Sequence, residues 1–341
     1  MERLFDPDIW REVTGGAIAE RVRRLTRVTP LVPAPTLGRR TGADIWLKLE
    51  CLQRTGSFKL RGALARLAAV ARDHESGAGG DGAKADRPRV IAASAGNHGL
   101  GVALAARTLD VDATILVSAQ TPALKRAGIA ALGAAVEVAG ATYDEAEAAA
   151  RARASADPGL VFVSAFDDDY VIAGNGGLLA REILAQLPDV EQIVVPVGGG
   201  GLAGGIGVEM VPRGISILGV SPEVNCAMKR SLDEGRACTV YDGGPTLAEG
   251  LEGAVSERTF AMARDYFPEI TLVSEVAIRR AIVYAYRSLG ILCEASAAPA
   301  LATLLEDPAL VRGKRVVVLI SGGNIEPALL DQLLAGTVTS S

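Results

Sequence analysis

Residues 192–205 have the sequence QIVVPVGGGGLAGG, and this stretch is the clearest indicator of the fold class. After Gln192, residues 193–197 form a valine-rich apolar run, which is typical of a strand buried on both faces of a sheet. Four consecutive glycines follow, and their entropic cost argues against an incidental turn. A buried strand, a glycine turn and small residues that open a helix predict one unit of a parallel α/β sheet.

The same alternation extends outward over most of the chain. Val- and Ile-rich runs predict further strands at Arg89–Ala93, Ala113–Val117, Ala135–Val138, Leu160–Val163, Ile215–Val220 and Arg315–Ile320. Helical spacing predicts helices at Asn97–Leu109, Tyr143–Ala156, Ile172–Leu187, Val276–Leu289 and Ser296–Leu304. We therefore predict an α/β fold of mostly parallel twisted sheets flanked by helices, and 341 residues fit two lobes better than one. The Gly/Ala/Asp-rich segment Ser76–Asp86 is predicted to be a mobile surface loop.

The composition excludes several classes of protein. A net charge of −5 and an aromatic content of 4% argue against a nucleic-acid partner. Four scattered cysteines without a CxxC pair indicate free thiols in a reducing compartment. Because His74 and His98 are the only histidines, a Ser-His-Asp triad or a multi-histidine metal site is nearly excluded. No signal peptide or membrane helix is recognisable, so we expect a cytoplasmic protein with no membrane partner.

A lysine stands near the start of a predicted helix in TGSFKLRGA, residues 55–63. Ser57 is a candidate N-cap, and leucines follow at helical spacing, so Lys59 falls in the first helical turn. The helix dipole disfavours a cation there and helps to keep an amine neutral and nucleophilic. A solvated surface lysine is the alternative that this segment alone leaves open.

A second segment, SAGNHG at residues 94–99, follows the predicted strand Arg89–Ala93 and opens a helix. Its small residues let several backbone N–H groups converge on an anion at the helix N-terminus. A plain strand-to-helix turn capped by Asn97, with His98 as a structural histidine, is the alternative.

The third segment, GGGGLAGG at residues 198–205, contains no basic side chain. It would therefore bind a phosphate through backbone amides and the helix dipole. Gly199, Gly201 and Gly204 also fit GxGxxG, and Glu223 lies about 20 residues beyond them, as a dinucleotide site requires. A dinucleotide site is therefore a rival interpretation of this segment.

A fourth segment, SGGN at residues 321–324, follows the predicted strand Arg315–Ile320. A serine at the carboxyl end of a parallel strand lies where open α/β sheets bind ligands, although Ser321 or Asn324 could instead cap a helix. In their order, the four segments resemble those of the fold-type II pyridoxal-phosphate enzymes, within them the serine/threonine dehydratase (ammonia-lyase) group. The resemblance extends from about Thr29 to about Leu334.

This resemblance implies a tryptophan synthase beta-subunit-like fold with pyridoxal 5′-phosphate as cofactor. The large lobe, which binds the cofactor, would comprise residues 1–56 and 165–341. The small lobe, residues 57–164, would carry the segment that binds the substrate carboxylate. A homodimer or homotetramer is expected. Because the chain ends at Ser341, shortly after SGGN, we expect no C-terminal regulatory domain.

The resemblance also implies a role for each segment. Lys59 would attach the cofactor covalently and later remove the α-proton of the substrate. Phe58 would pack beside the pyridine ring, and Asn97 would donate a hydrogen bond to the 3′-oxygen. Ser321 would face the pyridine nitrogen, and Glu294 would lie near the ring. The phosphate contacts would come from Gly198, Gly199, Gly200, Gly201 and Leu202. The substrate carboxylate would be bound by Ser94, Ala95, Gly96, Asn97 and His98.

The implied activity is elimination of the β-hydroxyl from L-threonine or L-serine, which gives a 2-oxo acid and ammonia. A neutral hydroxyl cannot hold the pyridine nitrogen protonated, and a weaker electron sink favours prompt elimination over reprotonation. Alternatives are dehydratases of hydroxyaspartate, phenylserine or a hydroxyectoine-derived amino acid, a serine racemase, or a β-replacement synthase. An inactive, cofactor-binding regulatory protein is the alternative from another class.

The sequence departs from the group at several positions. Ala95 stands where racemases carry a second serine, so we expect racemisation to be far slower than elimination. Ser221 and Ala227 stand where the group often has Glu and Asp ligands for a divalent cation, so we expect no metal site. Cys51 replaces a common Asn, and Asn175 replaces a usual Gln close to the expected place of the substrate side chain.

Overall fold

The computed structural model describes residues 4–77 and 87–336, so most of the predicted loop Ser76–Asp86 lies outside the described residues. Contacts divide the chain into two compact units. Unit 1 contains Val28–Phe58 and the chain from Leu179 onward, and unit 2 contains Phe5–Arg27 and Lys59–Leu178. This division places residues 5–27 and 165–178 with Lys59, whereas the sequence assigns them to the large lobe. The lobe boundaries stay a prediction.

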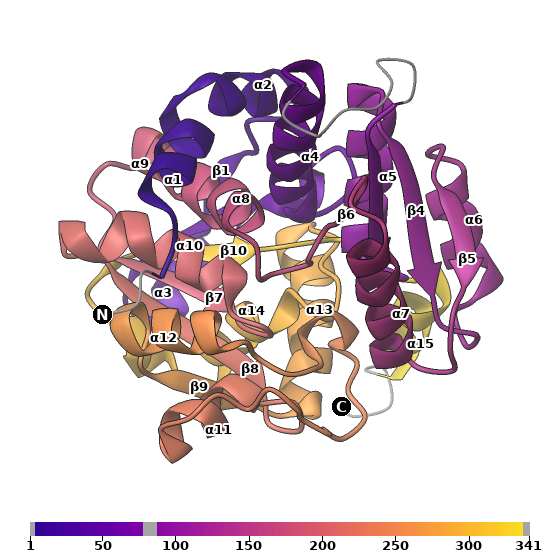
Figure 1. The fold of residues 1–341 in the computed structure, drawn as a ribbon. Coiled ribbons are helices and arrows are strands. Elements are labelled where there is room, and N and C mark those ends of the chain that lie inside the picture. Colours follow the sequence, from indigo (N-terminus) through magenta and orange to yellow (C-terminus); the bar gives the residue numbers. More distant parts are fainter. Residues whose placement is uncertain (1–3, 78–86, 337–341) are drawn as a thin grey trace. The chain divides into compact units, whose positions relative to one another are not determined.

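Unit 1 is built on a six-stranded sheet with the order β1-β2-β10-β7-β8-β9 (Figure 1). Its strands are β1 (Leu31–Pro33), β2 (Asp44–Leu49), β7 (Gln192–Pro196), β8 (Ser216–Pro222), β9 (Ile270–Val273) and β10 (Arg315–Ile320). β1 pairs antiparallel to β2, and the other neighbours are parallel. The helices of this unit are α3 (Pro35–Thr41), α9 (Leu178–Gln186), α10 (Gly201–Met210), α11 (Ala227–Glu234), α12 (Glu257–Tyr266), α13 (Glu275–Leu289), α14 (Ala298–Glu306) and α15 (Pro327–Gly336).

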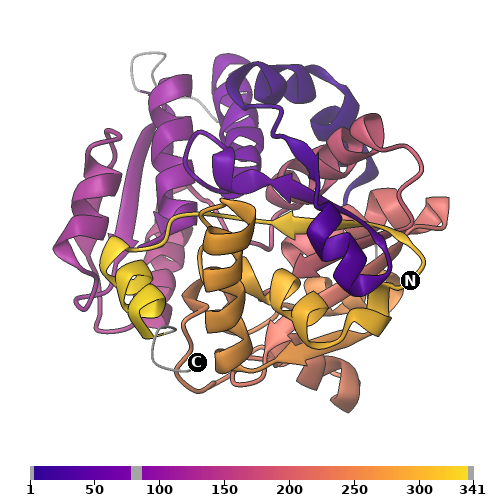
Figure 2. The same cartoon turned by 180° about the vertical axis from the view of Figure 1, so that it is seen from behind.

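Strand β10 shows how helices cover both faces of this sheet. Val316, Val318 and Ile320 pack into one core cluster with residues of α13 and α14. Val317 and Leu319 point into a second cluster, which contains residues of α9, α10 and α12. Successive strand residues alternate between faces, so a continuous apolar run supplies both clusters. Figure 2 shows the first face, with the orange α13 in front of the yellow β10.

Unit 2 holds a four-stranded parallel sheet with the order β5-β4-β3-β6. Its strands are β3 (Arg89–Ala93), β4 (Asp112–Val117), β5 (Ala135–Val138) and β6 (Leu160–Phe162). Its helices are α1 (Pro7–Gly15), α2 (Ala17–Leu25), α4 (Lys59–Glu75), α5 (Asn97–Leu109), α6 (Ala123–Ala130), α7 (Tyr143–Ala156) and α8 (Asp169–Ile172). The predicted α/β class with parallel sheets flanked by helices is therefore confirmed in both units.

The differences from the sequence prediction include three strands and one helix interruption, and helices α1, α2, α3, α6, α11, α12 and α15 were not predicted either. β1, β2 and β9 were not predicted, because β1 and β9 have only three and four residues and β2 carries a lysine inside its apolar run. The helix predicted at Ile172–Leu187 is interrupted by a π-helical turn, Ala173–Gly177, with the sequence AGNGG. Glycine disfavours the regular helix, and this turn separates α8 from α9.

Candidate active site

In unit 1, the glycine segment forms the turn between β7 and α10. Gly200 is the N-cap of α10, with a left-handed φ of 88° and no side-chain cap. The first bond into this helix is donated by the Gly204 N–H to the Gly200 carbonyl. The N–H groups of Gly201, Leu202 and Ala203 precede that bond and have no acceptor within the helix. Together with the helix dipole, they form a cradle for an anion.

The glycines are also required by packing. A Cβ atom on Gly198 would lie 2.8 Å from the Leu251 Cα, and one on Gly200 would lie 2.5 Å from the Met228 Cε. A larger residue at Gly198 would therefore move the main chain away from its present path, and at Gly200 the left-handed φ strains any side chain although the Met228 methyl could move aside. The backbone alone forms this cradle, and its shape depends on having glycine, with no side chain, at residues 198 and 200.

Ser321 lies directly after β10 in the same unit and is 3% exposed. The segment that it begins runs antiparallel to residues 55–58, with Ser57 opposite Gly322. The Ser321 carbonyl accepts from the Phe58 N–H at 3.1 Å, and the Gly323 N–H donates to the Gly56 carbonyl at 2.9 Å. The backbone just before Lys59 is therefore fixed against the SGGN segment.

Glu294 and Asn324 extend this arrangement. Glu294 is buried, its N–H donates to the Gly322 carbonyl at 3.1 Å, and its Oε2 accepts from the Asn324 N–H at 3.1 Å. The Asn324 Nδ2 donates to the Thr55 carbonyl at 2.8 Å. Glu294 thus braces the SGGN backbone, and its expected place near the pyridine ring stays a prediction. The cap alternative for Asn324 is wrong, because α15 begins only at Pro327.

Two thiols lie in this neighbourhood of unit 1. Burial raises the pKa of the Cys51 thiol to about 12, and Glu50 and Glu294 add to the rise. Burial also raises the pKa of the Cys293 thiol well above its ordinary value. Both groups are therefore protonated near neutral pH and are poor nucleophiles.

In unit 2, Lys59 is the first residue of α4 and is half-buried. Its Nζ donates to the Ala165 carbonyl at 2.8 Å, which fixes the direction of the side chain. The predicted place of Lys59 in the first helical turn is confirmed. The predicted N-cap role of Ser57 is wrong, because the helix begins two residues later. The buried Ser57 Oγ makes no hydrogen bond to any described residue.

The SAGNHG segment forms the turn between β3 and α5 of unit 2. The buried Ser94 Oγ accepts from the Gly96 N–H at 3.1 Å, and Gly96, not Asn97, is the N-cap. The first bond into α5 runs from the Leu100 N–H to the Gly96 carbonyl, so the amides of Asn97, His98 and Gly99 precede it. A Cβ on Gly96 would meet no atom within 4 Å, so there is open space beside this residue. The geometry fits a bound carboxylate.

The His98 ring is not a donor for that carboxylate. Its Nε2 lies 3.0 Å from the Val163 carbonyl, which can only accept, so the ring proton is on Nε2. Burial, with the nearby Lys59 charge, lowers the pKa of His98 to about 3. The ring is therefore neutral and committed to Val163, and only the main-chain N–H of His98 is available to the expected carboxylate.

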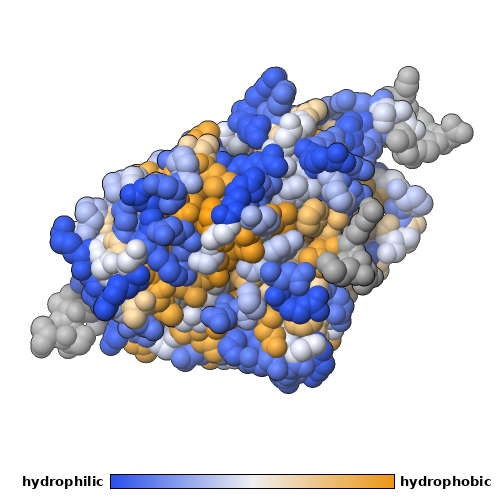
Figure 3. Space-filling view, turned by 90° about the vertical axis from the view of Figure 1, so that its left-hand side faces the viewer, coloured by the Kyte–Doolittle hydropathy of each residue, from blue (hydrophilic) through white to orange (hydrophobic). Residues whose placement is uncertain are grey.

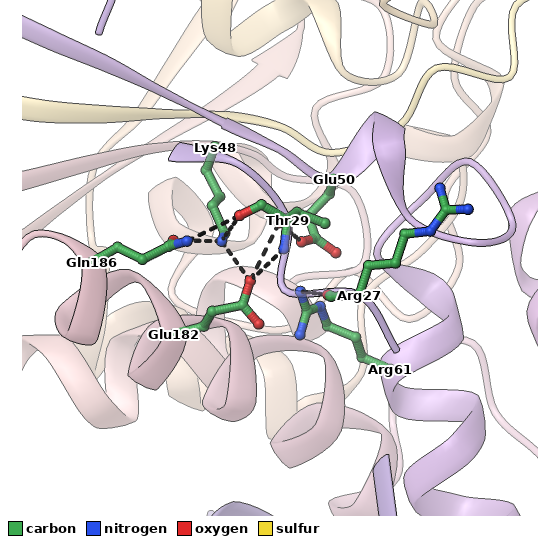
Figure 4. Close-up of polar contacts among 7 residues, drawn as sticks. All are labelled: Arg27, Thr29, Lys48, Glu50, Arg61, Glu182 and Gln186. Carbon is green, nitrogen blue, oxygen red and sulfur yellow. Dashed lines mark hydrogen bonds and ion pairs between the residues drawn. The ribbon is translucent and has the colours of Figure 1, made fainter. Parts of the chain in front are cut away.

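A buried charge network in unit 1 was not found from the sequence (Figure 4). The fully buried Lys48 Nζ donates to the Glu182 Oε1 at 2.5 Å, the Gln186 Oε1 at 2.7 Å and the Thr29 carbonyl at 2.8 Å. The Thr29 Oγ1 donates to the Glu50 Oε1 at 2.5 Å. All three protons of the Lys48 ammonium have acceptors, as a buried cation requires. A lysine within the apolar run of β2 was the available signal.

The family model described as "Pyridoxal-phosphate dependent enzyme" matches residues 22–322, which is most of the chain. The chain belongs to this family. These enzymes depend on pyridoxal phosphate, so the rival dinucleotide interpretation of the glycine segment is not supported.

Individual proteins similar to this pyridoxal-phosphate enzyme include a threonine ammonia-lyase and a serine racemase. An L-threonine ammonia-lyase from Thermotoga maritima is 39% identical over 93% of this chain and 77% of its own. The solved threonine deaminase isoform 2 from Solanum lycopersicum, in its processed form, has a TM-score of 0.84 at 32% identity and covers 97% of this chain and 94% of its own. Maize serine racemase has a TM-score of 0.85 at 26% identity, with 98% of each chain covered.

Each unit holds residues that fit the cofactor. Unit 1 offers the uncapped amides at the start of α10 to the phosphate, and Ser321 at the end of β10 to a ring nitrogen. Unit 2 offers Lys59, an amine that can attach an aldehyde. The roles of Phe58, Asn97 and the remaining predicted contacts stay predictions.

Residues 4–77 and 87–336 contain neither a cluster of metal ligands nor a helix that could span a bilayer. No group of three or more His, Cys, Asp or Glu side chains in these ranges is placed to hold a metal ion. Ser221, at the expected metal position, donates its Oγ to the Val197 carbonyl at 2.7 Å. No helix in these ranges combines the length and the apolar character that a bilayer span requires.

Proposed function

We propose that the protein is an ammonia-lyase that converts L-threonine or L-serine into a 2-oxo acid and ammonia. The observation that carries the proposal is Ser321, a buried neutral hydroxyl at the carboxyl end of β10. By the family resemblance, this hydroxyl would face the pyridine nitrogen. The similarity to the threonine ammonia-lyase of Thermotoga maritima supports the same reaction class.

The chain's own groups would bind the substrate and move its proton. Bound pyridoxal phosphate supplies an electron sink for the α-carbon of the amino acid. The main-chain amides at the start of α5, from Asn97 to Gly99, would bind the carboxylate. The Lys59 amine, oriented by its bond to the Ala165 carbonyl, would accept the α-proton. Loss of this proton and of the β-hydroxyl leaves an enamine, which water hydrolyses to the 2-oxo acid and ammonia.

Ser321 would bias the outcome toward elimination. A hydroxyl cannot keep the pyridine nitrogen protonated as a carboxylate would, so negative charge at the α-carbon is stabilised less. Departure of the β-hydroxyl is then favoured over return of the proton.

The visible absorption spectrum of the purified holoenzyme tests the proposal, recorded before and after addition of L-threonine or L-serine with a parallel 2-oxo acid assay. We expect the cofactor band to shift and 2-oxo acid to accumulate. A band that ignores both amino acids would contradict the proposed substrates. Product that forms only with an added thiol would instead indicate a β-replacement synthase.

Racemisation is expected to be a minor activity, because Ala95 places no proton donor where racemases carry a serine. A positioned acid or base contributes about 10²- to 10⁴-fold, so D-serine should form at least about a hundredfold more slowly than 2-oxo acid. Ala95→Ser should raise the D-serine rate and change elimination little. Chiral chromatography of L-serine reactions measures both products. Equal rates in the unmodified protein would contradict the expectation.

We also propose a homodimer or homotetramer that works in the cytoplasm. Exposed large apolar side chains include Val28, Val240, Val276, Tyr286 and Leu292. On the face shown in Figure 3, apolar surface gathers near the centre and is bordered by polar residues. Such patches favour association. The four cysteines are free thiols, which suits a reducing compartment. Light scattering after size-exclusion chromatography gives the mass, and a monomer would contradict the proposed assembly.

A further inference from the structure

The first turn of α4 requires hydrogen-bond acceptors from outside the helix. Lys59, Leu60 and Arg61 are its first three residues, and their N–H groups have no acceptor within an α-helix, while the Gly62 N–H stands where the first bond within the helix would begin. In unit 2, the Gly62 N–H donates to the Asn175 Oδ1 at 2.8 Å. Asn175 is 2% exposed and is separated from Gly62 by 113 residues in the sequence. The side-chain amide of Asn175, which is distant in the sequence, therefore supplies a hydrogen-bond acceptor to the first turn of the helix that begins with Lys59.

Asn175 lies in the π-helical turn Ala173–Gly177, and this turn packs directly on the α4 backbone. A Cβ on Gly174 would lie 2.8 Å from both the Arg61 carbonyl oxygen and the Gly62 Cα. A Cβ on Gly62 would lie 2.7 Å from the Asn175 Cγ. Glycines at both positions allow this close approach, and the carboxamide fills the remaining space. π-Helical turns are frequent at functional sites.

A second helix of unit 2, α5, packs on the first turn of α4. A Cβ on Gly101 of α5 would lie 3.2 Å from the Lys59 carbonyl carbon and 3.3 Å from the Leu60 nitrogen. The Lys59 main chain is thus packed against α5, while its side chain reaches the Ala165 carbonyl. The hydrogen bond from Gly62 to Asn175 supplies the directional contact in this packing.

We propose that Asn175 is a positioning residue for Lys59. By accepting the Gly62 N–H, it fixes the first turn of α4 and with it the point from which the Lys59 amine works. Asn175 itself need not touch the substrate for this role. Only the kinetic test of this inference rests on the proposed ammonia-lyase function. The hydrogen bond between Gly62 and Asn175 can also be tested in protein that is not turning over substrate.

The kinetic test compares Asn175→Ala with Asn175→Asp in the holoenzyme. Alanine removes the acceptor, whereas aspartate keeps an oxygen at the same distance from the backbone. Misplacement of a reacting group by an ångström can cost about a hundredfold in rate. We expect Asn175→Ala to lower kcat for L-threonine by about tenfold or more, with KM changed by less than about threefold, and Asn175→Asp to regain most of the loss.

Amide hydrogen exchange of the cofactor-free full chain gives the second readout. Asn175→Ala should increase exchange in the peptide that covers residues 59–65, and Asn175→Asp should restore protection there. Asn225→Ala is the matched control, because Asn225 is a buried asparagine of unit 1 whose Nδ2 donates to the Gly244 carbonyl at 2.6 Å. It should lower the melting temperature and leave both kcat and exchange at residues 59–65 unchanged.

The outcomes separate this inference from the proposed function. If the unmodified holoenzyme forms no 2-oxo acid, the proposed function fails, and the exchange data still decide the role of Asn175. If the unmodified enzyme is active and Asn175→Ala matches its kcat, the positioning role is wrong. It is also wrong if alanine and aspartate are equally impaired, or if Asn225→Ala loses as much kcat as Asn175→Ala.

Discussion

Lys59→Ala is expected to abolish elimination of L-threonine and L-serine. The amine is proposed both to attach the cofactor and to remove the α-proton, and a positioned base alone accounts for about 10²- to 10⁴-fold in rate. We therefore expect 2-oxo acid formation to fall by at least about three orders of magnitude. The absorption band of the cofactor attached to Lys59 should also be replaced by that of unattached cofactor. A coupled 2-oxo acid assay and the visible spectrum measure both effects.

Lys314→Ala is the control for this substitution. Lys314 directly precedes β10 and therefore lies at the opposite end of the strand from Ser321, where its Nζ donates to the Gln192 Oε1 at 3.3 Å. Its removal should leave elimination unchanged. Lys59→Ala should fold normally, since the lost bond to the Ala165 carbonyl is worth about 1 kcal/mol. A folded Lys59→Ala protein with more than about a tenth of the parental rate would contradict the assignment of Lys59 as the base.

Gly200→Ala is expected to weaken binding of pyridoxal phosphate. The residue has φ of 88°, where a side chain is strained, and the new Cβ would lie 2.5 Å from the Met228 Cε and 3.2 Å from the Thr259 Cβ. The Met228 methyl can move aside, but the strained φ and the Thr259 Cβ oppose the new side chain, so we expect the turn to shift and the amides at the start of α10 to diverge from a common point. A hydrogen bond to a charged group is worth about 1.5–3 kcal/mol, so loss of one should raise the Kd about ten- to hundredfold. Titration of cofactor-stripped protein, followed by absorbance, measures this.

Gly214→Ala separates the cradle from backbone strain. Gly214 has a similar φ of 79°, and a Cβ there would meet no atom within 4 Å. Both substitutions should lower the melting temperature through the left-handed conformation. Only Gly200→Ala should change the cofactor Kd. If the two variants bind pyridoxal phosphate equally well, the phosphate is bound elsewhere.

The elements that sequence reasoning found share a strong local signal. The predicted bounds of Arg89–Ala93, Asn97–Leu109 and Tyr143–Ala156 agree with the structure, because each has a clear apolar period and a small residue or turn at its start. The turns that hold Lys59, Gly200 and Ser321 were located for the same reason. Each comes at the junction of an apolar run and a small-residue segment.

The contacts that fix those turns could not be predicted, because they join residues far apart in the sequence. The Asn324 Nδ2 donates to the Thr55 carbonyl across 269 positions, and the Gly62 N–H donates to Asn175 across 113. Local patterns contain no information about such pairs. Ser57 illustrates the reverse error, since a serine before a helix is a common cap and tertiary packing instead placed it in a strand-like bridge with Gly322.

The position of β10 in the sheet has a consequence for synthesis of the chain. This strand pairs with β2 on one side and β7 on the other, although it is made after every other strand in residues 4–77 and 87–336. β1 and β2 therefore have no partner on the β10 side while residues 50–314 are added, which takes roughly 15–50 s at about 5–20 residues per second. Until then the nascent chain exposes an apolar two-stranded edge. Ribosome-bound chains that stop before Arg315 should be aggregation-prone and protease-sensitive, because β10 is the strand that joins β2 to β7 in the sheet of unit 1.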